Sequence, residues 1–137
     1  MKVSFKAVYV KGFDRARYFM GLEPYKNMFR NLLGREPYEG TLNIKLNNKS
    51  YRDLLKECGS SLVIENFSYN GREYGGLYIW FGEVKEIGKV LVIRPFRSGH
   101  EENVLEIVSD QKISDVLNLK HGDLIEVHIE CNPPKNK

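Results

Sequence analysis

The 137-residue sequence contains no long apolar run. No stretch approaches the roughly 20 apolar residues that a membrane-spanning helix needs, and Lys6 and Lys11 interrupt the apolar N-terminal segment, so a signal peptide is not expected. The sequence therefore predicts a cytoplasmic protein that has no membrane partner.

Cysteine and histidine are scarce as well. Cys58 and Cys131 are far apart and match neither a metal-ligand spacing nor a disulfide framework, so we expect two separate thiols. The three histidines have no spacing that would place two metal ligands together on a helix or strand. A zinc site is therefore not expected.

The familiar phosphate-binding motifs are also missing. The sequence contains no Walker A motif, no G-x-G-x-x-G loop after a strand and no kinase catalytic loop. Any phosphoryl transfer would need a different nucleotide-binding segment.

Positive charge gathers in the first part of the chain. Residues 1–60 carry 12 Lys and Arg against 6 Asp and Glu, whereas the rest carries 9 against 12. The basic part favours an anionic ligand or nucleic acid, and the alternative is a set of solvated faces with no ligand.

What the sequence does have is the pattern of a folded β protein, with 42% hydrophobic and 28% charged residues. Short strand patterns recur with turn signals between them, and Asn70-Gly71 is a strong hairpin signal. About seven strands and two or three short helices predict a mostly β fold, a small closed or nearly closed barrel with helical insertions. We expect one domain over residues 1–131 and a flexible tail over 132–137. The expected strands cover residues 3–10, 41–46, 61–67, 74–84, 90–93, 104–108 and 124–129, and the expected helices cover 24–33, 51–58 and 113–119.

One strand begins with oxygen-bearing side chains. From Thr41 the residues alternate, so Thr41, Asn43 and Lys45 share a polar face while the apolar residues between them share the other. Uncharged oxygens hold Mg²⁺ poorly without help from phosphates, so a metal here would arrive with a nucleotide. The alternative is a hydrogen-bonding pair that opens the strand, and residue types alone favour it.

Two further positions allow a structural or a functional interpretation. The loop over residues 12–17 holds Arg15 and Arg17, which could bind phosphate or lie on an exposed turn. Glu106 is a lone acid in an apolar strand, either facing outward or aimed into a site, and the alternation favours the outward position.

Several segments together resemble the archaeal-type CTP-dependent riboflavin kinases over essentially the whole chain. The residues that carry the resemblance are Arg17-Tyr18-Phe19, Pro24-Tyr25-Lys26, Phe29, Leu33-Gly34, the block Glu36-Pro37-Tyr38-Glu39-Gly40-Thr41-Leu42-Asn43, Leu46 and Asn118-Leu119-Lys120-His121-Gly122-Asp123. The resemblance implies a six-stranded cradle-loop (RIFT-like) barrel. It also implies transfer of the γ-phosphate of CTP to the 5′-hydroxyl of riboflavin, which yields FMN and CDP.

The resemblance assigns roles position by position. Thr41 and Asn43 match the ligands of one Mg²⁺ ion, and Ser98 and Glu106 match the flavin contacts. The nucleotide-binding positions are Gly12, Phe13, Asp14, Arg15, Ala16, Arg17, Gln111, Lys112, Ile113 and Ser114. The first loop departs from the family at Arg15 and Ala16, where relatives are glycine-rich, and Ser98 replaces a threonine but keeps the hydroxyl.

A mechanism follows from these assignments as a hypothesis. Mg²⁺ with cationic help from Arg15, Arg17 or Lys112 would neutralise charge, and Glu106 would orient the hydroxyl or take its proton. We expect a monomer that does not bind nucleic acid. One alternative is a nucleic-acid-binding barrel, and the lack of a recognition-helix module in this sequence weighs against it. The other alternative is a flavin carrier without turnover.

Overall fold

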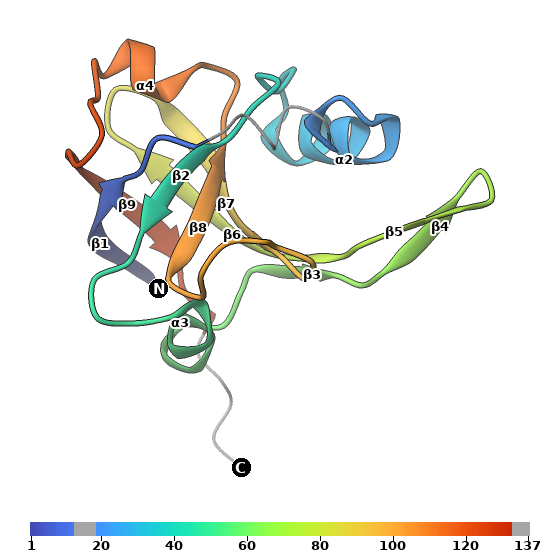
Figure 1. The fold of residues 1–137 in the computed structure, drawn as a ribbon, viewed down its shortest axis with the longest axis horizontal. Coiled ribbons are helices and arrows are strands. Elements are labelled where there is room, and N and C mark those ends of the chain that lie inside the picture. The colour runs from blue at the N-terminus through green and yellow to red at the C-terminus, as the bar shows by residue number, and fades with distance from the viewer. Residues whose placement is uncertain (13–18, 133–137) are drawn as a thin grey trace.

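Alternating strands each have an apolar face to bury, and this chain buries those faces inside a closed barrel (Figure 1). The computed structural model describes residues 1–12 and 19–132. Six antiparallel strands follow the order β6, β7, β8, β2, β1 and β9, and β9 pairs with β6 to close the barrel. The predicted mostly β barrel is therefore confirmed. The barrel strands are β1 (Lys2–Tyr9), β2 (Leu42–Lys45), β6 (Leu77–Val84), β7 (Gly88–Pro95), β8 (Val104–Val108) and β9 (Leu124–Glu130).

The described residues form three further strands outside the barrel. β3 (Leu62–Ile64) pairs with β6, while β4 (Phe67–Tyr69) and β5 (Arg72–Tyr74) form a hairpin that extends away from the barrel (Figure 1). At its tip Asn70 and Gly71 have φ values of 51° and 74°, as the expected Asn-Gly turn requires. The sequence predicted strands over residues 61–67 and 74–84, the second with a bulge or close backbone approach at Gly75-Gly76. In the structure the first divides between β3 and β4 and the second between β5 and β6. The close approach is present, because a Cβ on Gly76 would overlap the Ile64 carbonyl oxygen.

Three helices have bounds within the described residues, namely α2 (Glu23–Leu33), α3 (Tyr51–Glu57) and α4 (Ile113–Val116). α2 begins with a proline in its first turn, ends at Gly34 with φ of 77°, and buries the apolar stripe that the sequence predicted. α4 is shorter than the expected 113–119, and Asn118 beyond it has φ of 51°. No helix within residues 1–12 and 19–132 is long and apolar enough to cross a membrane.

Two apolar clusters lie on opposite sides of the barrel wall. The interior cluster takes side chains from all six barrel strands, including Leu42 and Ile44 of β2 and the fully buried Trp80 of β6. The outer cluster lies between α2 and the outer face of β6 and β7, with Phe29 and Ile93 fully buried in it. Because Leu42 and Ile44 point inward, the polar residues that alternate with them face the outer side, where α2 also packs.

The two cysteines are paired. Cys58 at the end of α3 and Cys131 after β9 form a disulfide with Cα atoms 4.8 Å apart. The expectation of two separate thiols is therefore wrong. An isolated β-bridge between Gly59 and Asn132 brings the segments together, a contact that the spacing of the cysteines in the sequence does not reveal.

Candidate active site

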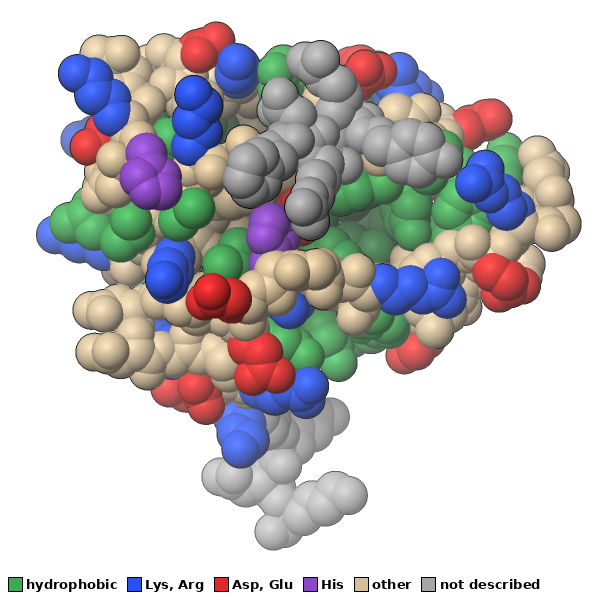
Figure 2. Space-filling view, in the orientation of Figure 1, with side chains coloured by type: hydrophobic (Ala, Val, Ile, Leu, Met, Phe, Trp, Pro, Cys, Tyr) green, Lys and Arg blue, Asp and Glu red, His purple; other side chains and the backbone are tan. Residues whose placement is uncertain are grey.

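A cavity of about 1650 Å³ opens on the outer side of the barrel wall. It is bounded by β2, β8, the end of β1, the start of α4, the base of the β4–β5 hairpin and the loop over residues 96–103. Figure 2 shows a hollow in this face with hydrophobic side chains on its floor. Its size exceeds that of a typical small-molecule site, which leaves room for two substrates side by side.

The strand alternation of β2 delivers polar side chains to this cavity. Thr41, Asn43 and Lys45 line it, as the sequence predicted for their shared face. Asn43 lies directly opposite Glu106 of β8 in the antiparallel register. The Thr41 hydroxyl donates a hydrogen bond of 2.7 Å to the Glu106 carboxylate. Three oxygen-bearing side chains, from β2, from the residue just before it and from β8, therefore meet in the cavity wall.

Glu106 is not a solvent-facing residue of its strand. It is only 5% exposed, although its alternation with apolar neighbours favoured an outward position. Burial raises the pKa of the Glu106 carboxyl, while the hydrogen bond from Thr41 and the positive charge of His100 and Arg94 act in the opposite direction. A carboxyl group with a raised pKa is a good proton acceptor near neutral pH.

The Asn43 amide is held in place but incompletely bonded. A Cβ on Gly12 would overlap the Asn43 amide nitrogen, so only glycine lets the chain after β1 pass here. The Val10 N–H donates a hydrogen bond of 3.0 Å to the main-chain carbonyl oxygen of Asn43. The side-chain oxygen, Oδ1, is buried and has no hydrogen-bond partner among the described residues. Such an orphaned oxygen is available to a ligand.

These oxygens fit a hard divalent cation. Thr41 Oγ1, the free Asn43 Oδ1 and the Glu106 carboxylate are the donor types that Mg²⁺ accepts. In the part of the chain that the structure describes, no three His, Cys, Asp or Glu side chains gather to form a metal site. A cation at Thr41 and Asn43 would therefore need further oxygens from a substrate such as a nucleotide phosphate.

The structure describes only Gly12 of the first expected nucleotide-binding segment but all of the second. Gly12 lines the cavity, whereas Phe13, Asp14, Arg15, Ala16 and Arg17 lie outside the described residues. The second segment lines the cavity around the start of α4 with all four of its residues, Gln111, Lys112, Ile113 and Ser114. The Gln111 side chain donates to the Ile87 carbonyl at 3.3 Å, and Ile113 is buried in the interior cluster. Lys112 and Ser114 therefore offer the polar side chains.

The loop over residues 96–103 brings Ser98 to the cavity. The Ser98 hydroxyl accepts a hydrogen bond of 3.1 Å from the His100 N–H, so the loop is folded back on itself. Arg97 and His100 also line the cavity, and the sequence analysis assigned them no role. The Arg97 side chain lies close to Gly75 of the hairpin base, where a Cβ would be 3.1 Å from it, a contact that sequence spacing does not reveal.

The segment over residues 118–123, which carries part of the family resemblance, also reaches the site. His121 Nδ1 accepts a hydrogen bond of 3.1 Å from the Lys11 N–H, which ties the turn before β9 to the chain leading into the first nucleotide segment. Charged side chains of both signs line the cavity, and its cations are of the kind that bind an anionic ligand. The cations are Lys11, Lys45, Arg72, Arg97, Lys112 and Lys120, and the acids are Glu39, Glu73, Glu101, Glu106 and Asp115.

Comparison with known proteins shows the family to which the chain belongs. The family model CTP-dep_RFKase, described as "Domain of unknown function DUF120", matches residues 9–129. A riboflavin kinase of Methanococcus vannielii is 38% identical over 122 residues, which cover 86% of this chain and 91% of that protein. A riboflavin kinase of Archaeoglobus fulgidus is 34% identical over 130 residues, which cover 93% of this chain and 54% of that protein. The chain thus spans nearly the whole of the first relative and about half of the second. By these matches the chain belongs to the archaeal riboflavin kinase family that the CTP-dep_RFKase model describes.

Proposed function

We propose that this chain transfers the γ-phosphate of CTP to the 5′-hydroxyl of riboflavin, giving FMN and CDP. The observation that carries the proposal is the meeting of Thr41, Asn43 and Glu106 in the wall of a cavity large enough for two substrates. Family membership supports riboflavin as the acceptor, and the name of the matching family model supports CTP as the donor.

Thr41 Oγ1 and Asn43 Oδ1 are the proposed ligands of one Mg²⁺ ion. A hydroxyl group has one hydrogen to donate and two lone pairs, so Thr41 can donate to Glu106 and still bind a cation through its oxygen. When bound, the ion would neutralise charge on the nucleotide phosphates. Because the described residues place no group of three His, Cys, Asp or Glu side chains that could hold a metal ion, we expect metal and nucleotide to bind together.

Glu106 is the proposed proton acceptor for the riboflavin hydroxyl. Its burial and its bond to Thr41 place a carboxylate of raised pKa beside the proposed metal ligands. It would orient the 5′-hydroxyl for in-line attack and take its proton as the new phosphate ester bond forms. Ser98 on the neighbouring loop is the second proposed flavin contact.

The nucleotide would lie against Gly12 and the start of α4. Lys112 and Ser114 there are proposed to contact its phosphates, together with the segment that follows Gly12. We propose that residues 1–131 act as one catalytic domain.

The test is to incubate the protein with riboflavin and Mg²⁺ in the presence of each of the four nucleoside triphosphates. FMN and the nucleoside diphosphate are then measured by chromatography. We expect equal amounts of FMN and CDP with CTP, and little FMN with the other three. FMN formed equally well from ATP would refute the choice of donor. Riboflavin binding without any FMN would support a carrier instead of a kinase.

A further inference from the structure

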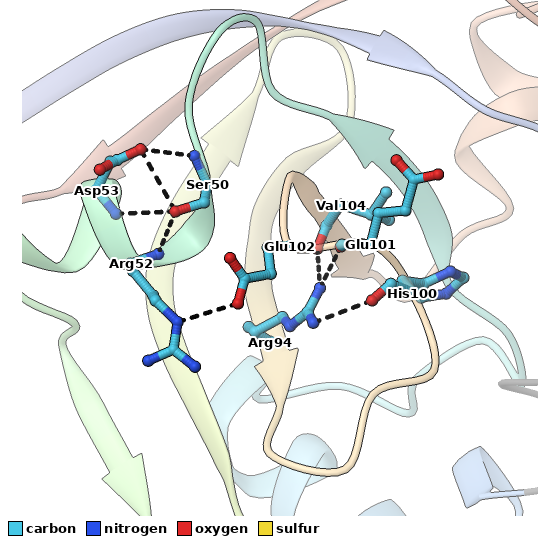
Figure 3. A network of polar contacts seen from close by, with 8 residues as sticks. All are labelled: Ser50, Arg52, Asp53, Arg94, His100, Glu101, Glu102 and Val104. Carbon is cyan, nitrogen blue, oxygen red and sulfur yellow. Dashed lines mark hydrogen bonds and ion pairs between the residues drawn. The ribbon is translucent and has the colours of Figure 1, made fainter.

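A buried arginine lies beside the loop over residues 96–103, and the proposed function assigns it no role. Arg94 near the end of β7 is 6% exposed. Its Nη1 donates to the carbonyl oxygens of Glu101 and Val104, both at 2.8 Å, and its Nη2 donates to that of His100 at 3.2 Å (Figure 3). The guanidinium carbon lies 4.5 Å from the centre of the Tyr51 ring. The charge is thus satisfied by three carbonyls and an aromatic face.

A cation in this position is costly. Burial lowers the pKa of Arg94, and nearby Tyr51, Glu106 and Glu102 only partly oppose that effect. Within residues 1–12 and 19–132 the guanidinium makes no ion pair with a carboxylate. Its hydrogen bonds go instead to carbonyls of the segment that joins β7 to β8 and to that of Val104, the first residue of β8. These hydrogen bonds therefore fix the backbone conformation of that segment.

This segment carries the proposed flavin contacts. The guanidinium holds the His100 carbonyl, and the N–H of the same residue donates to the Ser98 hydroxyl. Arg94 also holds the Val104 carbonyl at the start of β8, two residues before Glu106. One side chain thus connects the two proposed flavin contacts, Ser98 through His100 and Glu106 through the first residue of its strand.

We infer that Arg94 is a positioning residue for riboflavin, which fixes the loop over residues 96–103 so that Ser98 and Glu106 face one substrate. The inference rests on the proposed function, because that function makes these two residues flavin contacts. The planar fork of arginine matters here, since it reaches carbonyls in three directions at once. A lysine ammonium at the same place keeps the charge but is a compact point that does not reproduce the fork.

The experiment compares Arg94→Lys and Arg94→Met with a matched control, Arg52→Met. Arg52 pairs with Glu102 of the same loop, as Figure 3 shows. It lies 5.1 Å from the same Tyr51 ring, but its side chain is 64% exposed. Riboflavin affinity is measured by quenching of flavin fluorescence without nucleotide. KM for riboflavin and for the nucleotide, and the melting temperature, are measured in parallel.

For Arg94→Lys we expect roughly tenfold or greater loss of riboflavin affinity, from the loss of charge-assisted hydrogen bonds to the loop. KM for the nucleotide should stay within about twofold, since the nucleotide contacts lie on other elements, and Arg52→Met should match the wild type in both. The inference would be overturned if Arg94→Lys weakened the binding of riboflavin and of the nucleotide equally. A lower melting temperature with unchanged riboflavin affinity would also overturn it. If Arg94→Met does not fold, the lysine variant still decides. Because riboflavin affinity and the melting temperature are measured without turnover, these two readouts test the role of Arg94 even if no FMN is formed, and only the KM values need turnover.

Discussion

Replacing Thr41 with valine removes one hydroxyl from the site with little change of volume. The hydroxyl donates a 2.7 Å hydrogen bond to the buried Glu106 carboxylate. A hydrogen bond to a charged group contributes about 1.5–3 kcal/mol, and its loss leaves a buried acceptor unsatisfied. For a chain of this size we expect the melting temperature of Thr41→Val to fall by roughly 5–10 °C near neutral pH. Thr41→Ser keeps the hydroxyl and should stay close to the wild type in stability and activity.

The loss should depend on pH, with a sign that follows from the pKa of Glu106. Burial raises the folded-state pKa above the unfolded value of about 4.5. The stability that Glu106 contributes is therefore present below that value and is lost as the pH rises through the folded pKa. The Thr41 hydrogen bond lowers the folded pKa and so limits the loss. Thr41→Val lacks this bond, so the folded-state pKa of Glu106 should be higher in the variant than in the wild type. The difference in unfolding free energy between the two proteins should therefore widen as the pH rises.

The assay is urea unfolding of wild type, Thr41→Val and Thr41→Ser between about pH 5 and about pH 8, with turnover measured on the same samples. Thr41→Val should also lose Mg²⁺-dependent turnover, because valine has no oxygen for the metal. Equal unfolding free energies for Thr41→Val and wild type at every pH would refute the reasoning about the hydrogen bond. Full turnover of Thr41→Val would refute the metal assignment.

Three other substitutions test the same site. Asn43→Ala removes the unpartnered Oδ1, so it should abolish Mg²⁺-dependent turnover while riboflavin binding, measured by fluorescence, persists; unchanged turnover would contradict the metal assignment. Glu106→Gln should lower turnover by about 100-fold or more, as for the loss of a general base. Calorimetry should show it more stable than wild type at neutral and alkaline pH but not below about pH 4.5, since it removes a buried carboxylate of raised pKa. Gly12→Ala should raise the Mg²⁺ concentration needed for half-maximal turnover by about tenfold, because its Cβ displaces the Asn43 amide; an unchanged requirement would show that the chain relaxes without moving Asn43.

Local patterns predicted much of the fold. The stripe of α2 and the Asn70-Gly71 turn follow from spacings of a few residues, and the structure contains both. The ends and breaks of strands were less predictable. Residues 61–67 divide between β3 and β4 and residues 74–84 between β5 and β6, whereas the close backbone approach expected at Gly75-Gly76 is present.

The candidate site was predictable only in part. Alternation from Thr41 identified the polar face of β2, and a resemblance distributed along the chain identified the positions at which to expect ligands. Neither source predicted that Glu106 would be buried, because burial depends on packing on the outer side of the barrel wall. The role of Arg94 had no sequence signal, since its hydrogen bonds go to backbone carbonyls, which every residue carries.

The sequence alone thus determined the β-rich class, the inward face of β2 and the family resemblance, because each depends on residue types at fixed spacings. Only the tertiary structure decided that Thr41 bonds to Glu106 across 65 positions of the chain and that Cys58 pairs with Cys131 across 73. The physical reason is the same in both cases. Barrel closure sets which distant segments become neighbours, and the chemistry of a side chain does not encode which neighbour it will meet.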